Sequence, residues 1–132
     1  MTETSEVLEN VFECARLAAE KRGSQLLVLN VGALTGFTDY FLLVTASSDR
    51  RVRTIAEAVR DGMKEKGVVA LGIEGVKEGR WALVDFGAWV VHVFYEDLRG
   101  VFDLEGLWAE ARRVALPESV TVAGATARED GQ

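Results

Sequence analysis

Apolar residues recur at helical spacing in two stretches of the chain, one at its start and one near its middle. In residues 4–22 and again in 49–66 they return every three or four positions, which places them on one face of a helix. Gly23 and Gly67 follow these stretches and are suited to end them. The Ser-Ser-Asp at 47–49 can cap the second stretch at its start. The pattern therefore predicts two amphipathic helices.

Between and after these helices lie short apolar runs, which are typical of buried strands. The run at 39–46 (DYFLLVTA) has almost no polar side, so we expect both of its faces to be covered, as in the interior of a sheet flanked by helices. Gly87-Ala88 separates two further runs and predicts a hairpin. The predicted strands span residues 25–31, 39–46, 68–74, 81–86 and 89–95.

A last helix is predicted from the apolar residues between Leu104 and Val114, with Pro117 after its end. The order helix, two strands, helix, three strands, helix indicates an α/β (α+β) sandwich with a mixed sheet of about five strands flanked by helices. We expect one domain at residues 1–116. The small and polar residues 117–132 predict a disordered tail.

The composition agrees with a folded domain. The chain has 132 residues, of which 48% are hydrophobic and 27% charged, and its net charge is -6. This apolar content is too high for a disordered chain. No apolar run reaches the roughly 18 residues that a membrane-spanning helix needs. The acidic N-terminus also lacks the apolar stretch of a signal peptide, so we expect a cytoplasmic protein.

The negative charge is distributed unevenly. Residues 1–66 carry a net charge of -1 and residues 67–132 a net charge of -5. The acidic surface of the second half serves solubility, or it docks a basic protein partner, and the sequence leaves both interpretations open. An acidic chain is poorly suited to phosphate backbones, so we expect no direct nucleic-acid binding.

Few residues could carry catalysis or bind a metal. Cys14 is the only cysteine and His92 the only histidine, which excludes an internal disulfide and a zinc site built on several thiolates. We expect Cys14 to be a small packing residue and His92 to be a hydrogen-bonded structural residue within its strand. Asp39 and Asp85 lack the second carboxylate, two residues on, that two-metal nucleotidyl transfer needs. We therefore predict no catalytic residue, cofactor or metal.

Two groups of residues are candidates for contacts with a partner. Arg50, Arg51 and Arg53 crowd the first turn of the second helix, where the helix dipole disfavours cations. They form either a solvated helix end or a contact for acidic groups. Large aromatic residues are concentrated between residues 81 and 108. Several must pack in the core, but Trp, Tyr and Arg also dominate protein interfaces, and aromatics ringed by acidic groups would suit a basic protein.

Five motifs follow one another along the chain in a characteristic series. They are DYFLLVTASSDRRV at 39–52, GIEG at 72–75, WALVDFG at 81–87, VHVF at 91–94 and RGVFDLEGLW at 99–108. In this series they resemble the ribosomal silencing factor (RsfS, Iojap-like) family. The resemblance covers most of the chain, from the first helix to the end of the last motif.

The resemblance implies a nucleotidyltransferase-like fold without the catalytic carboxylates. It also implies binding to the large ribosomal subunit through its L-fourteen-type ribosomal protein, occlusion of the face that joins the small subunit, and repression of translation without enzyme activity. The protein-interface residues that we expect, from these motifs and their residue types, are Trp81, Asp85, Tyr95, Arg99 and Phe102, with Trp81 as the anchor.

Two alternatives remain open at this point. The fold analogy permits a nucleotide-binding or residual nucleotidyltransferase enzyme. The aromatic residues could instead pair two copies of the chain in a symmetric homodimer.

Overall fold

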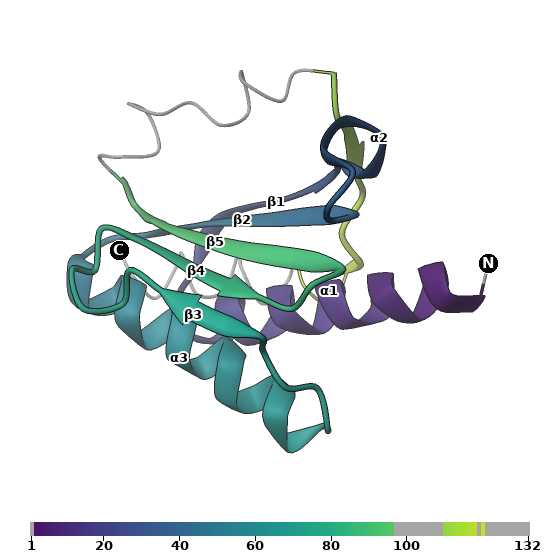
Figure 1. Ribbon diagram of the computed structural model, residues 1–132. Helices are drawn as coiled ribbons and strands as arrows, with labels where there is room; N and C mark the ends of the chain where they lie inside the picture. The colour runs from purple at the N-terminus through teal and green to yellow at the C-terminus, as the bar shows by residue number, and fades with distance from the viewer. Residues whose placement is uncertain (1, 97–109, 119, 121–132) are drawn as a thin grey trace.

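The computed structural model describes residues 2–96, 110–118 and 120, arranged as one sheet with two long helices on one of its faces (Figure 1). The helices are α1 (Thr2–Glu20), α2 (Gly32–Thr35) and α3 (Asp49–Glu65). The strands are β1 (Ser24–Asn30), β2 (Tyr40–Ala46), β3 (Gly72–Glu74), β4 (Trp81–Asp85), β5 (Trp89–Tyr95) and β6 (Arg112–Val114).

The sheet is mixed and has the strand order β3-β4-β5-β2-β1-β6. The central pair, β2 and β5, is parallel, and the other pairs are antiparallel. The predicted α+β architecture with a mixed sheet and flanking helices is therefore confirmed. Among the described residues the sheet has six strands, where the sequence predicted about five, because a sixth short strand pairs with β1.

The two long helices begin and end close to where the sequence predicted. The Ser48 hydroxyl accepts a hydrogen bond from the backbone N–H of Arg51 at 3.0 Å, which caps the first turn of α3. At its other end Gly67 adopts a left-handed conformation with φ of 86°, and the N–H of Val68 bonds to the carbonyl of Met63. The N-cap and the C-terminal glycine are thus the local reasons why this helix has its length.

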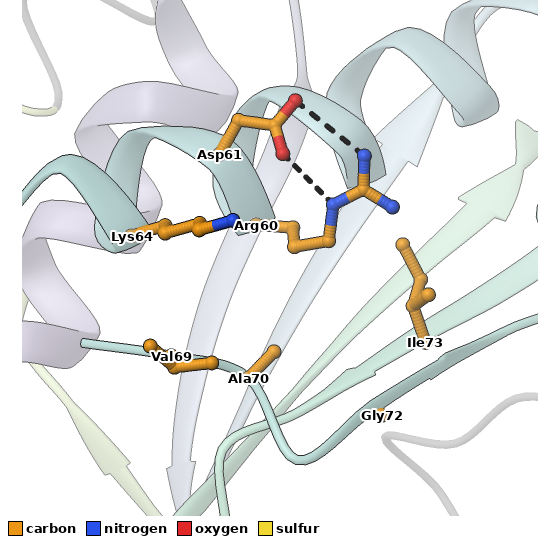
Figure 2. Close-up of a pocket in the computed structure, with 7 residues that line it drawn as sticks. All are labelled: Arg60, Asp61, Lys64, Val69, Ala70, Gly72 and Ile73. Atoms are coloured by element: carbon orange, nitrogen blue, oxygen red, sulfur yellow. Dashed lines mark hydrogen bonds and ion pairs between the residues drawn. The ribbon is translucent and has the colours of Figure 1, made fainter. Parts of the chain in front are cut away.

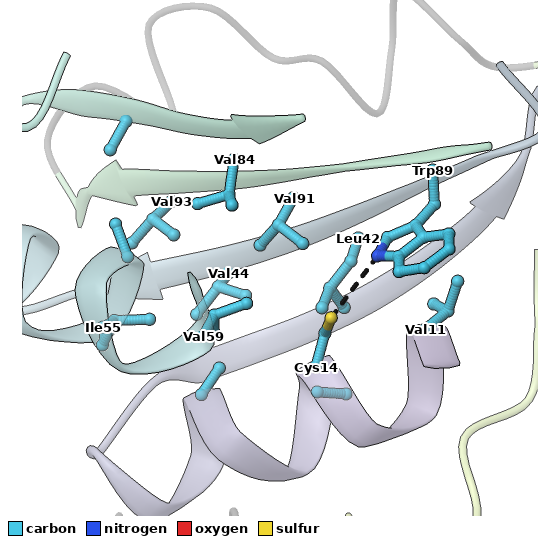
Figure 3. Close-up of a cluster of buried hydrophobic side chains, with 14 of the residues drawn as sticks. Val11, Cys14, Leu42, Val44, Ile55, Val59, Val84, Trp89, Val91 and Val93 are labelled. Carbon is cyan, nitrogen blue, oxygen red and sulfur yellow. Dashed lines mark hydrogen bonds between the residues drawn. The ribbon is translucent and has the colours of Figure 1, made fainter. Parts of the chain in front are cut away.

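One face of the sheet packs against α1 and α3 (Figure 3). Leu42 and Val44 of β2 and Val91 of β5 are fully buried there, against Val11 of α1 and Ile55 of α3. All seven residues of β2 are buried, which confirms the prediction that both faces of this strand are covered. The opposite face holds a second buried cluster, formed by Leu29, Val31, Phe41, Leu43 and Phe94.

Cys14 lies in the first cluster, as the sequence predicted for a small packing residue. Its thiol is fully buried, and the indole Nε1 of Trp89 donates a hydrogen bond to its Sγ at 3.4 Å (Figure 3). Burial raises the pKa of Cys14 to about 12, outweighing the opposing effect of the Trp89 hydrogen bond. The thiol is therefore protonated at neutral pH and joins α1 to the start of β5.

Two sequence predictions were wrong at particular residues. Residues 112–114, expected to end a last helix, form β6, because the backbone of β1 can pair with a further strand on that side. The rest of that predicted helix, 104–109, lies outside the described residues. The strand expected at 68–74 is confined to Gly72–Glu74, since the chain first turns away from α3.

The predicted boundary between domain and tail remains a prediction, because residues 121–132 lie outside the described part of the chain. Val120, just beyond the predicted boundary, is 2% exposed and belongs to the core cluster on the helical side of the sheet. Its N–H bonds to the carbonyl of Pro117 at 3.0 Å.

We predict that Gly75→Ala destabilises the fold strongly. Gly75 has a φ of 79°, and an added Cβ would lie 2.1 Å from the carbonyl oxygen of Trp81. Left-handed strain and this clash should together lower the free energy of unfolding by at least about 2 kcal/mol. Urea unfolding measures the effect. Gly72→Ala is the control, because nothing lies within 4 Å of its added Cβ. Equal stability of the two variants would contradict this account of the turn.

Candidate functional site

The structure describes three of the residues predicted to form an interface, namely Trp81, Asp85 and Tyr95. Trp81 and Asp85 are the first and last residues of β4 and point to the face away from α1 and α3. Four strand steps separate them, which is about 13 Å. Tyr95 ends β5 and belongs to the helix-covered face. The other two predicted residues, Arg99 and Phe102, lie outside the described residues.

Trp81 is half-buried, and its neighbours on the same face orient it. Its indole Nε1 donates a hydrogen bond to Nδ1 of His92 at 3.3 Å. Its ring packs on that of Phe94, the residue opposite it across the strand pair, with centroids 5.1 Å apart. A polar and an aromatic contact thus fix the indole on the sheet, while part of its surface stays exposed.

His92 is a buried structural residue, as the sequence predicted. Burial lowers the pKa of His92 from 6.5 to about 4, so the imidazole is neutral at neutral pH. Because Nδ1 accepts the hydrogen bond from Trp81, the ring proton is assigned to Nε2. This Nε2 is buried without a hydrogen-bond partner among the described residues. Holding Trp81 in place therefore requires the neutral form of the ring.

Asp85 is exposed, but its carboxylate also supports the turn between β4 and β5. Oδ1 accepts a hydrogen bond from the N–H of Gly87 at 2.8 Å, and Gly87 has a φ of 86°. The main-chain carbonyl of Asp85 accepts from the N–H of Leu71 at 2.7 Å. One carboxylate oxygen thus serves the fold, and the exposed position leaves the negative charge accessible to a partner.

Tyr95 is half-buried and lies at the end of the sheet that is far from Asp85. Its backbone N–H bonds to the carbonyl of Arg80 at 2.8 Å, which ties the end of β5 to the segment before β4. A small pocket beside it is lined by Ser48, Asp49, Glu78, Arg80 and Tyr95. Trp81 and Tyr95 are thus at the same end of the sheet but on opposite faces, which the sequence had not separated.

Sequence reasoning missed a group of exposed apolar side chains. Phe37 is 70% exposed and Leu71 is 75% exposed, and Leu34 and Val69 are also exposed. Val69 lines a shallow pocket between α3 and the segment before β3, in which Arg60 and Asp61 form an ion pair (Figure 2). A signal was available for Phe37, a large apolar residue within a loop, but the residues before β3 looked like part of a buried strand.

Two of the three arginines at the start of α3 are held by main-chain carbonyls, which the sequence did not predict. Arg51 Nη1 donates to the carbonyl of Lys21 at 3.4 Å, and Arg53 Nη1 donates to the carbonyl of Lys77 at 3.5 Å. Arg50 is exposed. Two of the guanidinium groups therefore bind main-chain carbonyls of neighbouring turns, and that of Arg53 also lies 4.0 Å from the carboxylate of Asp49.

Within residues 2–96, 110–118 and 120, no three His, Cys, Asp or Glu side chains come together as a metal site would require. Over the same residues, no helix is both long and apolar enough to span a membrane. The chemistry that the described site offers is contact by aromatic and charged side chains.

Comparison with solved structures places this architecture in a defined class. A crystal structure of a protein from Chromobacterium violaceum matches with a TM-score of 0.72 and 32% identity, covering 82% of this chain and 90% of that one. One from Bacillus halodurans matches with a TM-score of 0.71 and 31% identity, covering 85% of this chain and 99% of that one. The chain thus shares its open, helix-covered mixed sheet with bacterial proteins of similar size.

Sequence comparison gives the family. The family model described as "Ribosomal silencing factor during starvation" matches residues 4–132. The ribosomal silencing factor RsfS of Bacillus subtilis is 40% identical over 78% of this chain and 88% of its own length. The chloroplastic protein Iojap of Zea mays is 33% identical over 86% of this chain and 49% of its own length. The chain belongs to the ribosomal silencing factor family, which confirms the resemblance.

We predict that His92 makes the protein less stable in weak acid. The pKa of His92 is about 4 in the folded chain and near 6.5 when unfolded, so between these values the unfolded chain binds more protons. The free energy of unfolding should fall as pH drops from 7 to 4, by up to about 3 kcal/mol from this residue.

Urea unfolding between pH 4 and pH 7 measures this effect, with His92→Gln as the comparison. The glutamine can accept the Trp81 hydrogen bond but does not titrate, so its stability should vary less with pH. The carboxylates titrate in both proteins and cancel in the comparison. Parallel pH profiles would show that His92 is not buried as described.

Proposed function

We propose that this chain is an anti-association factor of the large ribosomal subunit. It binds that subunit through its L-fourteen-type ribosomal protein, and its body blocks the joining of the small subunit, which represses translation. The match of residues 4–132 to the silencing-factor family carries the proposal. Two relatives called ribosomal silencing factor RsfS support it. The one from Bacillus subtilis is 40% identical to this chain and the one from Chromobacterium violaceum is 36% identical.

A steric mechanism suits what this chain offers. A 14.4 kDa domain at a subunit interface needs affinity for one subunit and bulk that clashes with the other, and it needs no catalytic group. Its site of action would be the cytoplasm, where bacterial ribosomal subunits join.

The face of β4 that carries Trp81 and Asp85 is our proposed docking surface for the ribosomal protein. Trp81 is a large aromatic that His92 and Phe94 hold in one orientation, so little side-chain entropy is lost on binding. Asp85 adds an exposed negative charge about 13 Å away along the same strand. A protein interface of ordinary size is large enough to include both residues. A basic partner would complement the negative charge of Asp85.

We predict that Trp81→Ala weakens binding to isolated large subunits by about 30-fold, the loss of a central aromatic anchor. Asp85→Asn should have a smaller effect and reduce the salt dependence of binding, because it removes a charge but keeps an acceptor for the Gly87 N–H. Tyr95→Phe, on the opposite face, should bind nearly as the unchanged chain does. Co-sedimentation with purified subunits over a concentration series measures all three.

Phe37→Ala is the matched control, since it removes an exposed aromatic from another part of the surface. Urea unfolding of each variant, with Trp81→Phe included, measures its stability. A loss of binding through a lost contact can then be distinguished from a loss of binding through a destabilised fold. A well-folded Trp81→Ala that binds normally would remove Trp81 as the anchor. A chain that sediments with small subunits and not with large ones would refute the proposed function itself.

A further inference from the structure

Three segments that are distant in the sequence meet at one end of the molecule, on the left of Figure 1. They are the turn after α1, the first turn of α3 and the turn between β3 and β4. Arg51 and Arg53 join them by donating to the carbonyls of Lys21 and Lys77. An added Cβ on Gly79 would lie 2.7 Å from a carbonyl oxygen in the first turn of α3, so the β3–β4 turn packs directly against that helix.

Basic side chains dominate this end, which we call the basic end. It gathers seven of the fifteen lysines and arginines of the chain: Lys21, Arg22, Arg50, Arg51, Arg53, Lys77 and Arg80. Five are exposed, and Arg51 and Arg53 are half-buried. Five described acidic residues lie in these segments or directly beside them: Glu20, Asp49, Glu74, Glu78 and Glu96. Glu20 is paired with Arg16, and Asp49 lies 4.0 Å from Arg53.

The charge of the basic end is therefore opposite to that of the whole chain, whose net charge is -6. The N-terminus of α3 adds the positive pole of its helix dipole at the same place. Cations in a first helical turn oppose that dipole, so this arrangement weakens the helix slightly. A surface that concentrates cations at a cost to its own helix is suited to an anionic ligand.

Five of the seven cations are arginines, and two of these are already oriented. A guanidinium group has five N–H donors in a planar fork, and Arg51 and Arg53 each use one for a main-chain carbonyl. The remaining donors are positioned without further ordering of the side chain. Planar forks of this kind match the oxygens of phosphate groups.

We propose that the basic end binds the phosphate backbone of RNA. The alternative, an acidic protein, fits less well, because protein interfaces are built around apolar or aromatic anchors. The large apolar side chains that are exposed among the described residues, Leu34, Phe37, Val69 and Leu71, lie outside the segments of the basic end. The aromatic residue beside this end, Tyr95, is half-buried in a pocket that it shares with Asp49 and Glu78, whose carboxylates would repel an acidic protein. Phosphates need only the cations.

The inference rests on the proposed function for the source of the RNA, because a large ribosomal subunit presents RNA beside its proteins. It departs from the expectation that an acidic chain makes no contact with nucleic acid. That expectation was based on the net charge of the whole chain. A phosphate backbone interacts mainly with charges that lie within a Debye length, which is about 10 Å at 0.1 M salt. The basic end would add a second contact to the one made by the Trp81 face.

The test is binding of a fluorescein-labelled RNA hairpin of about 25 nucleotides to the purified full chain, followed by fluorescence anisotropy. With three phosphate contacts, the affinity should fall roughly 20- to 40-fold between 50 and 200 mM KCl. The triple variant R50Q/K77Q/R80Q should bind at least about 10-fold more weakly at 50 mM KCl, and the slope of its log affinity against log salt concentration should become shallower by about two. Among the described residues these three side chains form no hydrogen bond or ion pair, so the variant should remain folded.

The matched control is K64Q/R112Q/R113Q, which removes the same charge from exposed positions outside the basic end. It should change RNA affinity less than twofold. Equal loss in both triple variants, or no RNA binding by the unchanged chain at 50 mM KCl, would overturn the inference. Equally strong competition by polyglutamate of matched charge would also overturn it, in favour of an acidic protein partner.

Binding to the isolated L-fourteen-type ribosomal protein, measured alongside, separates this inference from the proposed function. R50Q/K77Q/R80Q should keep that binding while losing affinity for RNA. A chain that binds the RNA hairpin through the basic end but not the ribosomal protein supports the inference and refutes the proposed route of docking.

Discussion

The burial of β2 on both faces is the constraint on which the rest of the structure depends. Its seven residues are all buried, and it pairs with β1 on one side and with β5 on the other. A strand of this kind is stable only if one layer covers each face. α1 and α3 cover one face, and on the other face Phe41 and Leu43 of β2 are buried in a cluster with Phe94 of β5. The parallel partner β5 is thereby fixed beside β2, with His92 opposite Leu43.

The proposed docking face follows from that placement. β5 brings His92 to the face away from the helices, and the antiparallel pairing with β4 sets Trp81 opposite Phe94. The hydrogen bond between the indole and the imidazole links a residue of the surface to one of the interior. Because burial keeps His92 neutral, the link holds throughout the neutral pH range. An anchor fixed in this way is part of the fold, so its substitution must be judged by stability as well as by binding.

Local patterns were enough to place the long helices, the central strands and the β4–β5 hairpin, since periodicity and turn residues report on the immediate surroundings of each element. They failed for residues 112–114, where the choice of a strand depends on an open side of β1 elsewhere in the chain. The candidate site shows the same division. Trp81 and Tyr95 are both interface-type residues in matching motifs, yet only the register of β4 and β5 separates them onto opposite faces.

The sequence by itself determined the class of fold, the family and the chemical character of the chain, because composition, periodicity and ordered motifs are properties of the linear chain. It also determined that the net charge is -6. Where that charge lies in space was decided only by the tertiary structure. Residues near positions 21, 50 and 80 meet at one end because α1 and α3 both pack on the sheet and the strand order returns the β3–β4 turn to the start of α3. An acidic chain thus acquires a basic end, since the field at a surface depends on distances that folding creates.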